Sequence, residues 1–364
     1  VTSRYRGLYR SGKRVVFEYR IGDATIQDYA WESDGQFLRS VNINGELPAS
    51  ASLQLFRTAA DVVDAKGKSG IRILQGGPDL TVALHDASGK SELRTIPHDK
   101  TTGIHLLPAS EACVQIALIR GNEQQRQMAL AQFAAMSPPD VEEMTTGGPA
   151  RWAGKSVTTT GELGDANRAF AIDTLTIPYR DQNPFGTPFR LTGVDFFPDG
   201  RGVVTTLTGD VWLIEGLDAT LSQLTWTRIA AGLNQPLGVL VQDGKILVAG
   251  RDQITRLHDL NGDGEMDFYE CVTNQMQTVP GHNWVTCLHQ DDYDNLYFRA
   301  PVEGIVKFDS VAESLEILGN GLRHSNGMAA NRDGSIVFGT AQEGTWTPAT
   351  AIFEVGGGSY HGWN

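Results

Sequence analysis

The chain has 364 residues, which is enough for two domains that each bury their own core. Its 43 acidic residues outnumber its 30 basic residues and give a formal net charge of −13, which disfavours nucleic acids and anionic membrane surfaces as partners. The sequence has no run of eighteen apolar residues, so we expect no segment that spans a bilayer.

The N-terminal part reads as β-structure followed by one helix. Short β-rich segments at 14–21, 70–74 and 114–119 are separated by Gly, Asn and Asp turns, which predicts a β-sandwich or a small barrel. Strong helix formers occupy 123–136 and stop before Pro138 and Pro139. A Thr-Thr-Gly-Gly-Pro segment at 145–149 then reads as a linker. We therefore expect a β-domain over 1–145 and a second domain over 146–364.

A repeat dominates the second domain. Four tight Asp-Gly or Asp-Asn turns each precede a hydrophobic strand, and their aspartates lie 44, 51 and 39 residues apart: Asp199, Asp243, Asp294 and Asp333. This is the period of a four-stranded propeller blade, so the sequence predicts a β-propeller. A β-sandwich with recurrent hairpins is the alternative.

The length of this half supplies four or five blades at that period, fewer than a six-bladed ring needs. We expect a partial propeller of the six-bladed type, with one or two blades in a longer parent chain or in another polypeptide. The start at Val1, without Met, likewise predicts a processed protein or one cut from a longer chain.

One segment predicts a metal site from local chemistry alone. Residues 259–270 read Asp-Leu-Asn-Gly-Asp-Gly-Glu-Met-Asp-Phe-Tyr-Glu, the twelve-residue pattern of a calcium loop. Oxygen ligands at alternate positions and a glycine at the sixth suit a hard cation. The flanks are β-rich, so we expect the loop between strands rather than in an EF-hand. The predicted calcium-site residues are Asp259, Asn261, Asp263, Glu265 through its carbonyl, Asp267, and Glu270 unless the next strand carries it away. A solvated acidic turn without an ion is the alternative.

The three cysteines form neither a C-x-x-C pair nor the C-x-x-C-H motif for haem attachment, so we expect no thiolate zinc site and no c-type haem within this chain. Cys271 and Cys287 lie 16 residues apart on segments expected to be neighbouring strands. A disulfide between them and two buried free thiols are both consistent with this spacing.

Several segments of the second domain carry a family resemblance. They are Pro280–Phe298, Gly321–Met328, Gln342–Pro348 and Gly356–Trp363. These segments resemble the soluble quinoprotein glucose dehydrogenase and sorbosone dehydrogenase family. They are more similar to bacterial membrane-associated dehydrogenase-like propellers, which often continue into a C-terminal c-type cytochrome domain. The opening segment Tyr5–Arg14 is similar to a module found before such propellers.

The resemblance implies a periplasmic or extracellular oxidoreductase. It would oxidise a sugar or aldehyde and pass electrons to a quinone (PQQ) or to a haem in a cytochrome domain or partner subunit. His282 matches the family's catalytic base, and Arg323 matches the arginine beside the quinone, with His324 and Glu343 as further cofactor-binding candidates. Trp284 and Trp346 would form the floor on which the sugar stacks.

Each of these residues also has a structural reading. His282 could cap a hairpin, Arg323 could pair with Glu343 between two blades, and tryptophans are common between propeller blades. The alternative function is a non-catalytic propeller with a structural calcium ion, which binds a glycan or a protein partner or serves in assembly. A propeller fold alone does not decide between the two functions.

Overall fold

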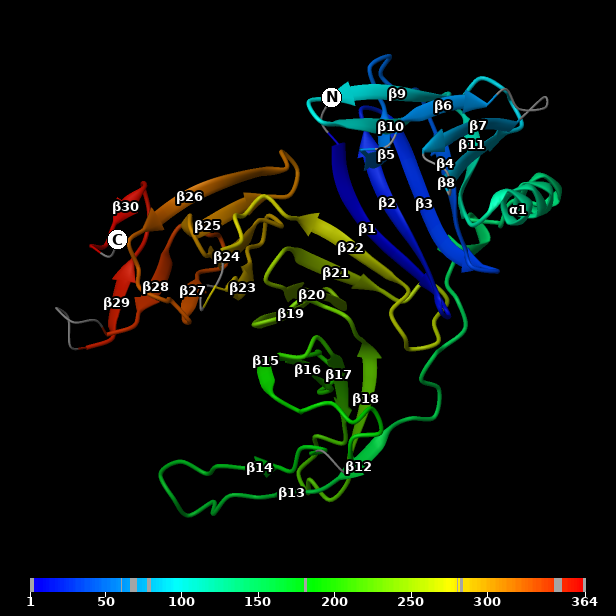
Figure 1. Cartoon of the computed structure of the whole chain (residues 1–364). Coiled ribbons are helices and arrows are strands. Elements are labelled where there is room, and N and C mark those ends of the chain that lie inside the picture. Colours follow the sequence, from blue (N-terminus) through cyan, green and yellow to red (C-terminus); the bar gives the residue numbers. More distant parts are fainter. Residues whose placement is uncertain are drawn as a thin grey trace. The chain divides into compact units, whose positions relative to one another are not determined.

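The computed structural model describes residues 3–59, 61–65, 71–76, 80–179, 182–279, 281, 284–343 and 349–362. The chain divides into two compact units, Val1–Pro149 and Ala150–Asn364 (Figure 1). None of the described helices is long and apolar enough to cross a membrane. Cys271 and Cys287 are free thiols, so the disulfide alternative is wrong.

The N-terminal unit consists of two antiparallel sheets and one helix. Its larger sheet has the strand order β1-β2-β3-β4-β11-β8-β7-β6, and its smaller sheet has the order β5-β10-β9. The strands are β1 (Ser3–Ser11), β2 (Arg14–Ile21), β3 (Ala24–Ser33), β4 (Gln36–Asn44), β5 (Leu53–Thr58), β6 (Val62–Ala65), β7 (Ile71–Gly76), β8 (Leu80–Asp86), β9 (Glu92–His98), β10 (Thr101–Leu107) and β11 (Ala112–Arg120).

Apolar and polar side chains alternate along these strands, and the apolar ones form a core between the two sheets. Ile26, Val41 and Val114 of the larger sheet pack with Ile104 and Leu106 of the smaller one. Because successive side chains of a strand point to opposite faces, one face of the larger sheet forms this core and the other is left for the helix. The predicted β-sandwich is therefore the observed fold of this unit.

The helix α1 (Glu123–Ala135) is capped by Asn122, whose side chain accepts the backbone N–H of Gln125, while the Gln125 side-chain oxygen accepts the backbone N–H of Asn122. This reciprocal capping explains why the helix starts where the sequence predicts. Phe133 packs against the second face of the larger sheet. Val141 and Met144, after the helix, pack into the same unit. The predicted boundary near 145 therefore falls inside a packed segment, and the chain leaves the unit only after Pro149.

In the described part of the C-terminal unit, four small sheets follow one another along the chain, and all their strand pairs are antiparallel except the parallel pair of β26 with β30. Their orders are β15-β16-β17-β18 with β12 beside β18, β19-β20-β21-β22, β23-β24-β25-β26 with β30 beside β26, and β27-β28-β29. The first two sheets use β12 (Val157–Thr159), β15 (Leu191–Phe196), β16 (Gly202–Thr206), β17 (Val211–Glu215), β18 (Leu224–Ala230), β19 (Gly238–Gln242), β20 (Lys245–Ala249), β21 (Ile254–His258) and β22 (Phe268–Thr273). The other two use β23 (Thr286–Gln290), β24 (Leu296–Ala300), β25 (Gly304–Asp309), β26 (Ser314–Asn320), β27 (Met328–Ala330), β28 (Val337–Ala341), β29 (Ala351–Glu354) and β30 (Ser359–Tyr360). A separate hairpin joins β13 (Gly161–Glu162) to β14 (Thr174–Leu175), and the short 3₁₀ helix η1 (Glu143–Thr145) belongs to the N-terminal unit.

Consecutive sheets pack face to face, as propeller blades do. Leu247 of the second sheet shares a core with Phe298 of the third, and Ile305 of the third shares one with Val337 of the fourth. The first strands of consecutive sheets are neighbours in space: β15 lies beside β19, β19 beside β23 and β23 beside β27. The described part of this unit is therefore a partial propeller with four blades, as the sequence predicts.

The four turn aspartates all join the first strand of a blade to its second strand. Asp243 and Gly244 both have positive φ, 49° and 74°, in a two-residue turn between Gln242 and Lys245, as a type I′ hairpin requires. In the third blade the buried Asp291 accepts hydrogen bonds from Tyr293 N, Asn295 Nδ2 and Tyr297 Oη at 2.8–2.9 Å. These side-chain bonds fix the turn that the sequence pattern predicts.

Because neighbouring strands are antiparallel, the connections of each blade alternate between two ends of the propeller. Links from a first to a second strand, and from a third to a fourth, lie at what we call the turn end. Links from a second to a third strand, and from one blade to the next, lie at the rim end. The turn aspartates and the segment 259–267, between β21 and β22, lie at the turn end.

Candidate functional site

The described residues among those that the family resemblance singles out lie at the rim end. Trp284 lies in the segment between β22 and β23, Arg323 and His324 lie in the link from β26 to β27, and Glu343 follows β28. Their loops belong to the third and fourth blades, whose first strands are neighbours. His282 and Trp346 lie outside the described residues, so their roles and the predicted closeness of His282 to Arg323 stay predictions.

Arg251, in the turn between β20 and β21, holds the segment before residue 282. Its Nη2 donates to the carbonyl oxygens of Val279 at 2.7 Å and Gly281 at 3.1 Å. Its Nη1 donates to Gln235 Oε1 at 2.8 Å. Charge-assisted bonds of this kind are about twice as strong as neutral ones. Arg251 therefore ties the link between the second and third blades to the link between the first and second.

Arg299, at the end of β24, holds the same loop on its other side. Its Nη1 donates to the carbonyl oxygen of Trp284 at 2.8 Å, and the indole Nε1 of Trp284 donates to Gln235 Oε1 at 3.0 Å. The Arg251 guanidinium lies 5.8 Å from the centre of the Trp284 ring. The two arginines thus fix the backbone on both sides of position 282, and Trp284 is held between them.

Arg251 and Arg299 place two positive charges beside this loop, and the same end also carries Asp252 and Glu303, of which Glu303 acts electrostatically on Arg299. Arg299 is only 6% exposed, and burial lowers the pKa of its guanidinium. Burial raises the pKa of the nearby Cys287 thiol, which therefore stays neutral at pH 7. Within the described chain, Arg251 and Arg299 donate to carbonyl and amide oxygens, so no hydrogen-bonded carboxylate neutralises either of them.

The two guanidinium groups are chemically suited to an anionic ligand. PQQ carries several carboxylates, and guanidinium groups bind carboxylates through paired N–H donors. The guanidinium groups at the rim end are thus of a type that can bind the carboxylates of the cofactor that the resemblance implies.

Arg323 and His324 lie where the chain approaches the first strand of the fourth blade. The carbonyl oxygen of Arg323 accepts the backbone N–H of Gln342 at 2.9 Å, which joins this link to the end of β28. His324 has a φ of 37°, an unusual conformation for a residue with a side chain. The next residue, Ser325, is fully buried, and its carbonyl oxygen accepts the Thr286 hydroxyl at 2.7 Å. Glu343 is exposed and accepts a bond from Thr350 Oγ1 at 3.3 Å.

The predicted calcium loop lies at the turn end and is ordered by its own side chains. Asp259 accepts the backbone N–H groups of Gly262 and Gly264 at 2.7 and 2.9 Å. Asn261 and Asp263 each accept the N–H two residues later, and Asp267 accepts that of Leu260. These bonds wrap residues 259–267 into a tight oxygen-rich turn.

The side chains of Glu265 and Glu270 have other partners, whereas the predicted ligand at Glu265 is its backbone carbonyl. Glu265 is 8% exposed and its Oε2 accepts the backbone N–H of Arg151 at 2.7 Å. Glu270 lies in β22, where its Oε2 is 2.8 Å from His258 Nε2 and accepts a bond from Arg256 Nη1 at 3.2 Å.

Because Glu270 lies in β22, its carboxylate contacts His258 and Arg256. In the part of the chain that the structure describes, no three His, Cys, Asp or Glu side chains are grouped to hold a metal ion. The calcium site stays a prediction from the loop pattern.

Sequence reasoning missed Gln235, Arg251 and Arg299. Arg299 carried a usable signal, since it stands in the otherwise apolar strand Leu-Tyr-Phe-Arg-Ala, and a charge inside such a strand is usually buried and paired. Gln235 and Arg251 carried none, because their partners come from other blades.

Comparisons with known proteins assign no family. No family model matches the chain, and no curated protein matches it. A solved structure from Thermus thermophilus, provisionally described as an oxidoreductase (glucose dehydrogenase), is 14% identical with a TM-score of 0.39. That match covers 48% of this chain and 65% of the other, less than two thirds of its length.

Two further structures match over more of the chain. A Lactobacillus plantarum protein is 10% identical over 99% of this chain and 97% of its own, with a TM-score of 0.33. A Bacteroides uniformis protein, provisionally described as a 6-phosphogluconolactonase, is 12% identical over 95% of this chain and 82% of its own, with a TM-score of 0.29. Likenesses at this level carry no inference about chemistry.

Proposed function

We propose that the C-terminal unit is the substrate-binding part of a quinone-linked or cytochrome-linked dehydrogenase that oxidises a carbohydrate-type alcohol or aldehyde outside the cytoplasm. The observation that carries the proposal is topological. The loop with position 282 and the link with Arg323 belong to adjacent blades and lie at the same end of the propeller. A base and a substrate anchor that act on one small molecule must share an end.

The anchoring of the 279–285 loop gives further support. Arg251 and Arg299 hold the carbonyl oxygens of residues on both sides of position 282. A positioned base contributes more to catalysis than a mobile one, because its approach to the substrate proton costs less entropy. We assign Arg251 and Arg299 as positioning residues for this loop.

The proposed chemistry divides between the cofactor and the chain. PQQ, when bound, supplies a two-electron acceptor. His282 would take the hydroxyl proton of the substrate, since imidazole titrates near neutral pH. Arg323 would orient the anionic cofactor, and Trp284 would offer an apolar face to the sugar ring.

The test is dye-linked oxidation. The purified chain is incubated with PQQ and calcium chloride and assayed with a panel of aldoses and simple aldehydes. We expect turnover of at least one of them, and His282→Ala should lower kcat by about 10²-fold or more, the usual contribution of a general base. His98→Ala, in the N-terminal unit, is the control and should leave the rate unchanged.

A second measurement separates catalysis from binding. If the chain binds a glycan on an array without oxidising any of the panel in the presence of PQQ, the dehydrogenase proposal fails and the propeller is a binding module. Equal rates for His282→Ala and the wild type would also overturn the assignment of the base.

A further inference from the structure

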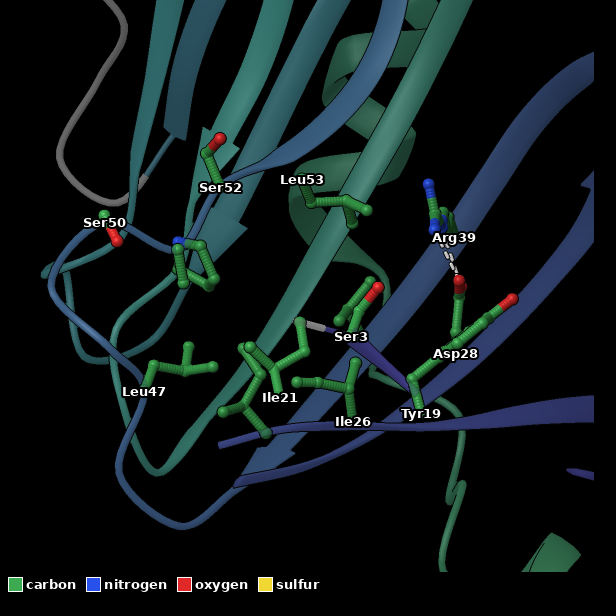
Figure 2. A pocket seen from close by; sticks show the side chains of 14 residues that line it. Ser3, Tyr19, Ile21, Ile26, Asp28, Arg39, Leu47, Ser50, Ser52 and Leu53 are labelled. Carbon is green, nitrogen blue, oxygen red and sulfur yellow. Dashed lines mark hydrogen bonds and ion pairs between the residues drawn. The ribbon is translucent and has the colours of Figure 1, made fainter. Parts of the chain in front are cut away.

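The N-terminal unit contains a cavity of about 560 Å³ that is separate from the propeller site. It lies between strands β1–β4 and the segment that leads into β5, and every residue lining it belongs to this unit. Figure 2 shows Tyr19, Asp28 and Arg39 together on one side of it and Ser50 and Ser52 on the other. Cavities of this size typically hold small organic ligands.

Most of the wall is apolar. Eight of the fourteen lining residues are aliphatic, alanine or proline, among them Leu47 and also Ile21 and Ile26, which Figure 2 shows between the two polar sides. Ile26, Val41 and Ile43 also belong to the core between the two sheets. The cavity is therefore a continuation of the sandwich interior that side chains do not fill, whereas protein interiors are normally close-packed.

The polar side is a fixed ion pair. Arg39 Nε donates to Asp28 Oδ1 at 2.7 Å, and Arg39 Nη2 donates to Asp28 Oδ2, so the pair is bidentate. The two side chains are 20% and 9% exposed. Arg39 has five N–H donors and uses two of them on Asp28, and it has no other hydrogen bond to the described residues.

Tyr19 adds a hydroxyl to this side. Burial, followed by the charge of Asp28, raises the pKa of Tyr19, so its hydroxyl keeps its proton and can donate at neutral pH. Ser3, from β1, lines the same cavity. The polar side thus offers N–H and O–H donors from Arg39 and Tyr19, and the charges of Arg39 and Asp28 cancel.

This arrangement selects the charge of a ligand. The pair has no net charge that would attract an anionic or a cationic head group, and either would lose its hydration on entering an apolar cavity. An uncharged oxygen can accept from the remaining donors without that loss. At about 30 Å³ for each water-sized group, the cavity has room for roughly 19 such groups.

We propose that this cavity binds a small amphiphile with an uncharged, oxygen-bearing head group. The head group accepts hydrogen bonds from Arg39 and Tyr19, and the apolar body lies against Ile26, Val41 and Ile43. The exposed Ser50 and Ser52 line the mouth. This inference is independent of the function proposed for the propeller.

The test uses three probes with one chain length: 1-decanol, decanoate and decylamine, each below its aggregation limit. Binding to the full chain is measured by displacement of a fluorescent naphthalene probe and by calorimetry. We expect saturable 1:1 binding of decanol, at least tenfold tighter than that of decanoate or decylamine. Absence of saturable decanol binding, or equal binding of all three probes, overturns the proposal.

Two variants locate the site. Asp28→Asn leaves Arg39 without its carboxylate, so decanoate should become the tightest of the three probes. The control Asp23→Asn removes a carboxylate that is 96% exposed and should leave the order of the probes unchanged. Ala51→Trp should fill the mouth and abolish binding of all three. Decanol binding that persists unchanged in Ala51→Trp overturns the assignment.

Folding of each variant is checked by near-UV circular dichroism. If Asp28→Asn does not fold, Asp28→Leu combined with Arg39→Met replaces the pair by apolar side chains, a change that buried ion pairs often tolerate. Decanol should then bind more weakly than it does to the wild type, because the Arg39 donors are gone. An unchanged affinity for decanol would contradict the role of the pair.

Discussion

The first propeller blade contains a buried ion pair whose removal should be costly. Arg228 Nη1 lies 3.1 Å from Asp210 Oδ1, and the two side chains are 10% and 6% exposed. The guanidinium carbon lies 3.2 Å from the ring centre of Phe185 and 4.0 Å from that of Trp152. Asp210 is thus the carboxylate paired with a cation enclosed by aromatic rings.

Asp210→Asn removes this counter-charge and keeps the size of the side chain. Breaking a buried pair by neutralising one partner costs about 3–5 kcal/mol, because the other charge stays buried. Asparagine retains one oxygen that can accept from Arg228 or from Thr187 Oγ1, now 3.2 Å from Asp210 Oδ2. We therefore expect the lower end of the range, about 3 kcal/mol.

The assay is urea unfolding followed by tryptophan fluorescence, since Trp152, Trp212 and Trp226 all lie in or beside this blade. With a slope of about 3 kcal/mol per molar urea, the midpoint of this transition should fall by about 1 M. Asp199→Asn is the matched control, because the Asp199–Arg201 pair has side chains 55% and 42% exposed. Exposed pairs contribute little, so this midpoint should hardly move. Equal shifts in both variants would refute the reasoning from burial.

Three further predictions concern the cation loop, the boundary and acid stability. Free calcium at 100 times Kd should stabilise the propeller by about 2.7 kcal/mol and raise its melting temperature by roughly 5–10 °C, and Asp263→Ala should abolish the difference between calcium and chelator in calorimetry. An unchanged melting temperature in the wild type would contradict the calcium site. Proteinase K, which has little sequence preference, should cut first near the exposed Arg151 and spare 141–148, which packs into the N-terminal unit, and mass spectrometry of early fragments checks this. Burial raises the pKa of Asp291, but the hydrogen bonds it accepts outweigh burial and hold it below its usual value of 3.8. A lowered folded-state pKa contributes stability above the unfolded pKa of about 3.9, and this contribution is lost as the pH falls through the folded value, so Asp291→Asn should flatten the loss of stability between pH 5 and pH 2 in urea titrations.

Local patterns in the sequence predicted much of the fold. The expected strand 14–21 is β2, and the expected helix 123–136 is α1, one residue shorter. The four turn aspartates predicted the hairpin between the first two strands of each blade, because an Asp-Gly or Asp-Asn turn is decided by φ values that few residues adopt. The acidic pattern 259–270 likewise marked a loop between two strands. Each of these features depends on residues close together in the chain.

Tertiary structure decided what no local pattern records. The position of the boundary depended on Val141 and Met144 packing back onto strands far earlier in the sequence. Arg251 and Arg299 hold the 279–285 loop through carbonyl oxygens of other segments, and the pairing of Arg39 with Asp28 closes one side of a cavity that four strands build together. Sequence determined the turns and the strand alternation, because these follow from the conformations and the polarity of consecutive residues. The sequence alone does not show which charged side chains are buried together. This depends on the packing of strands that are far apart in the chain.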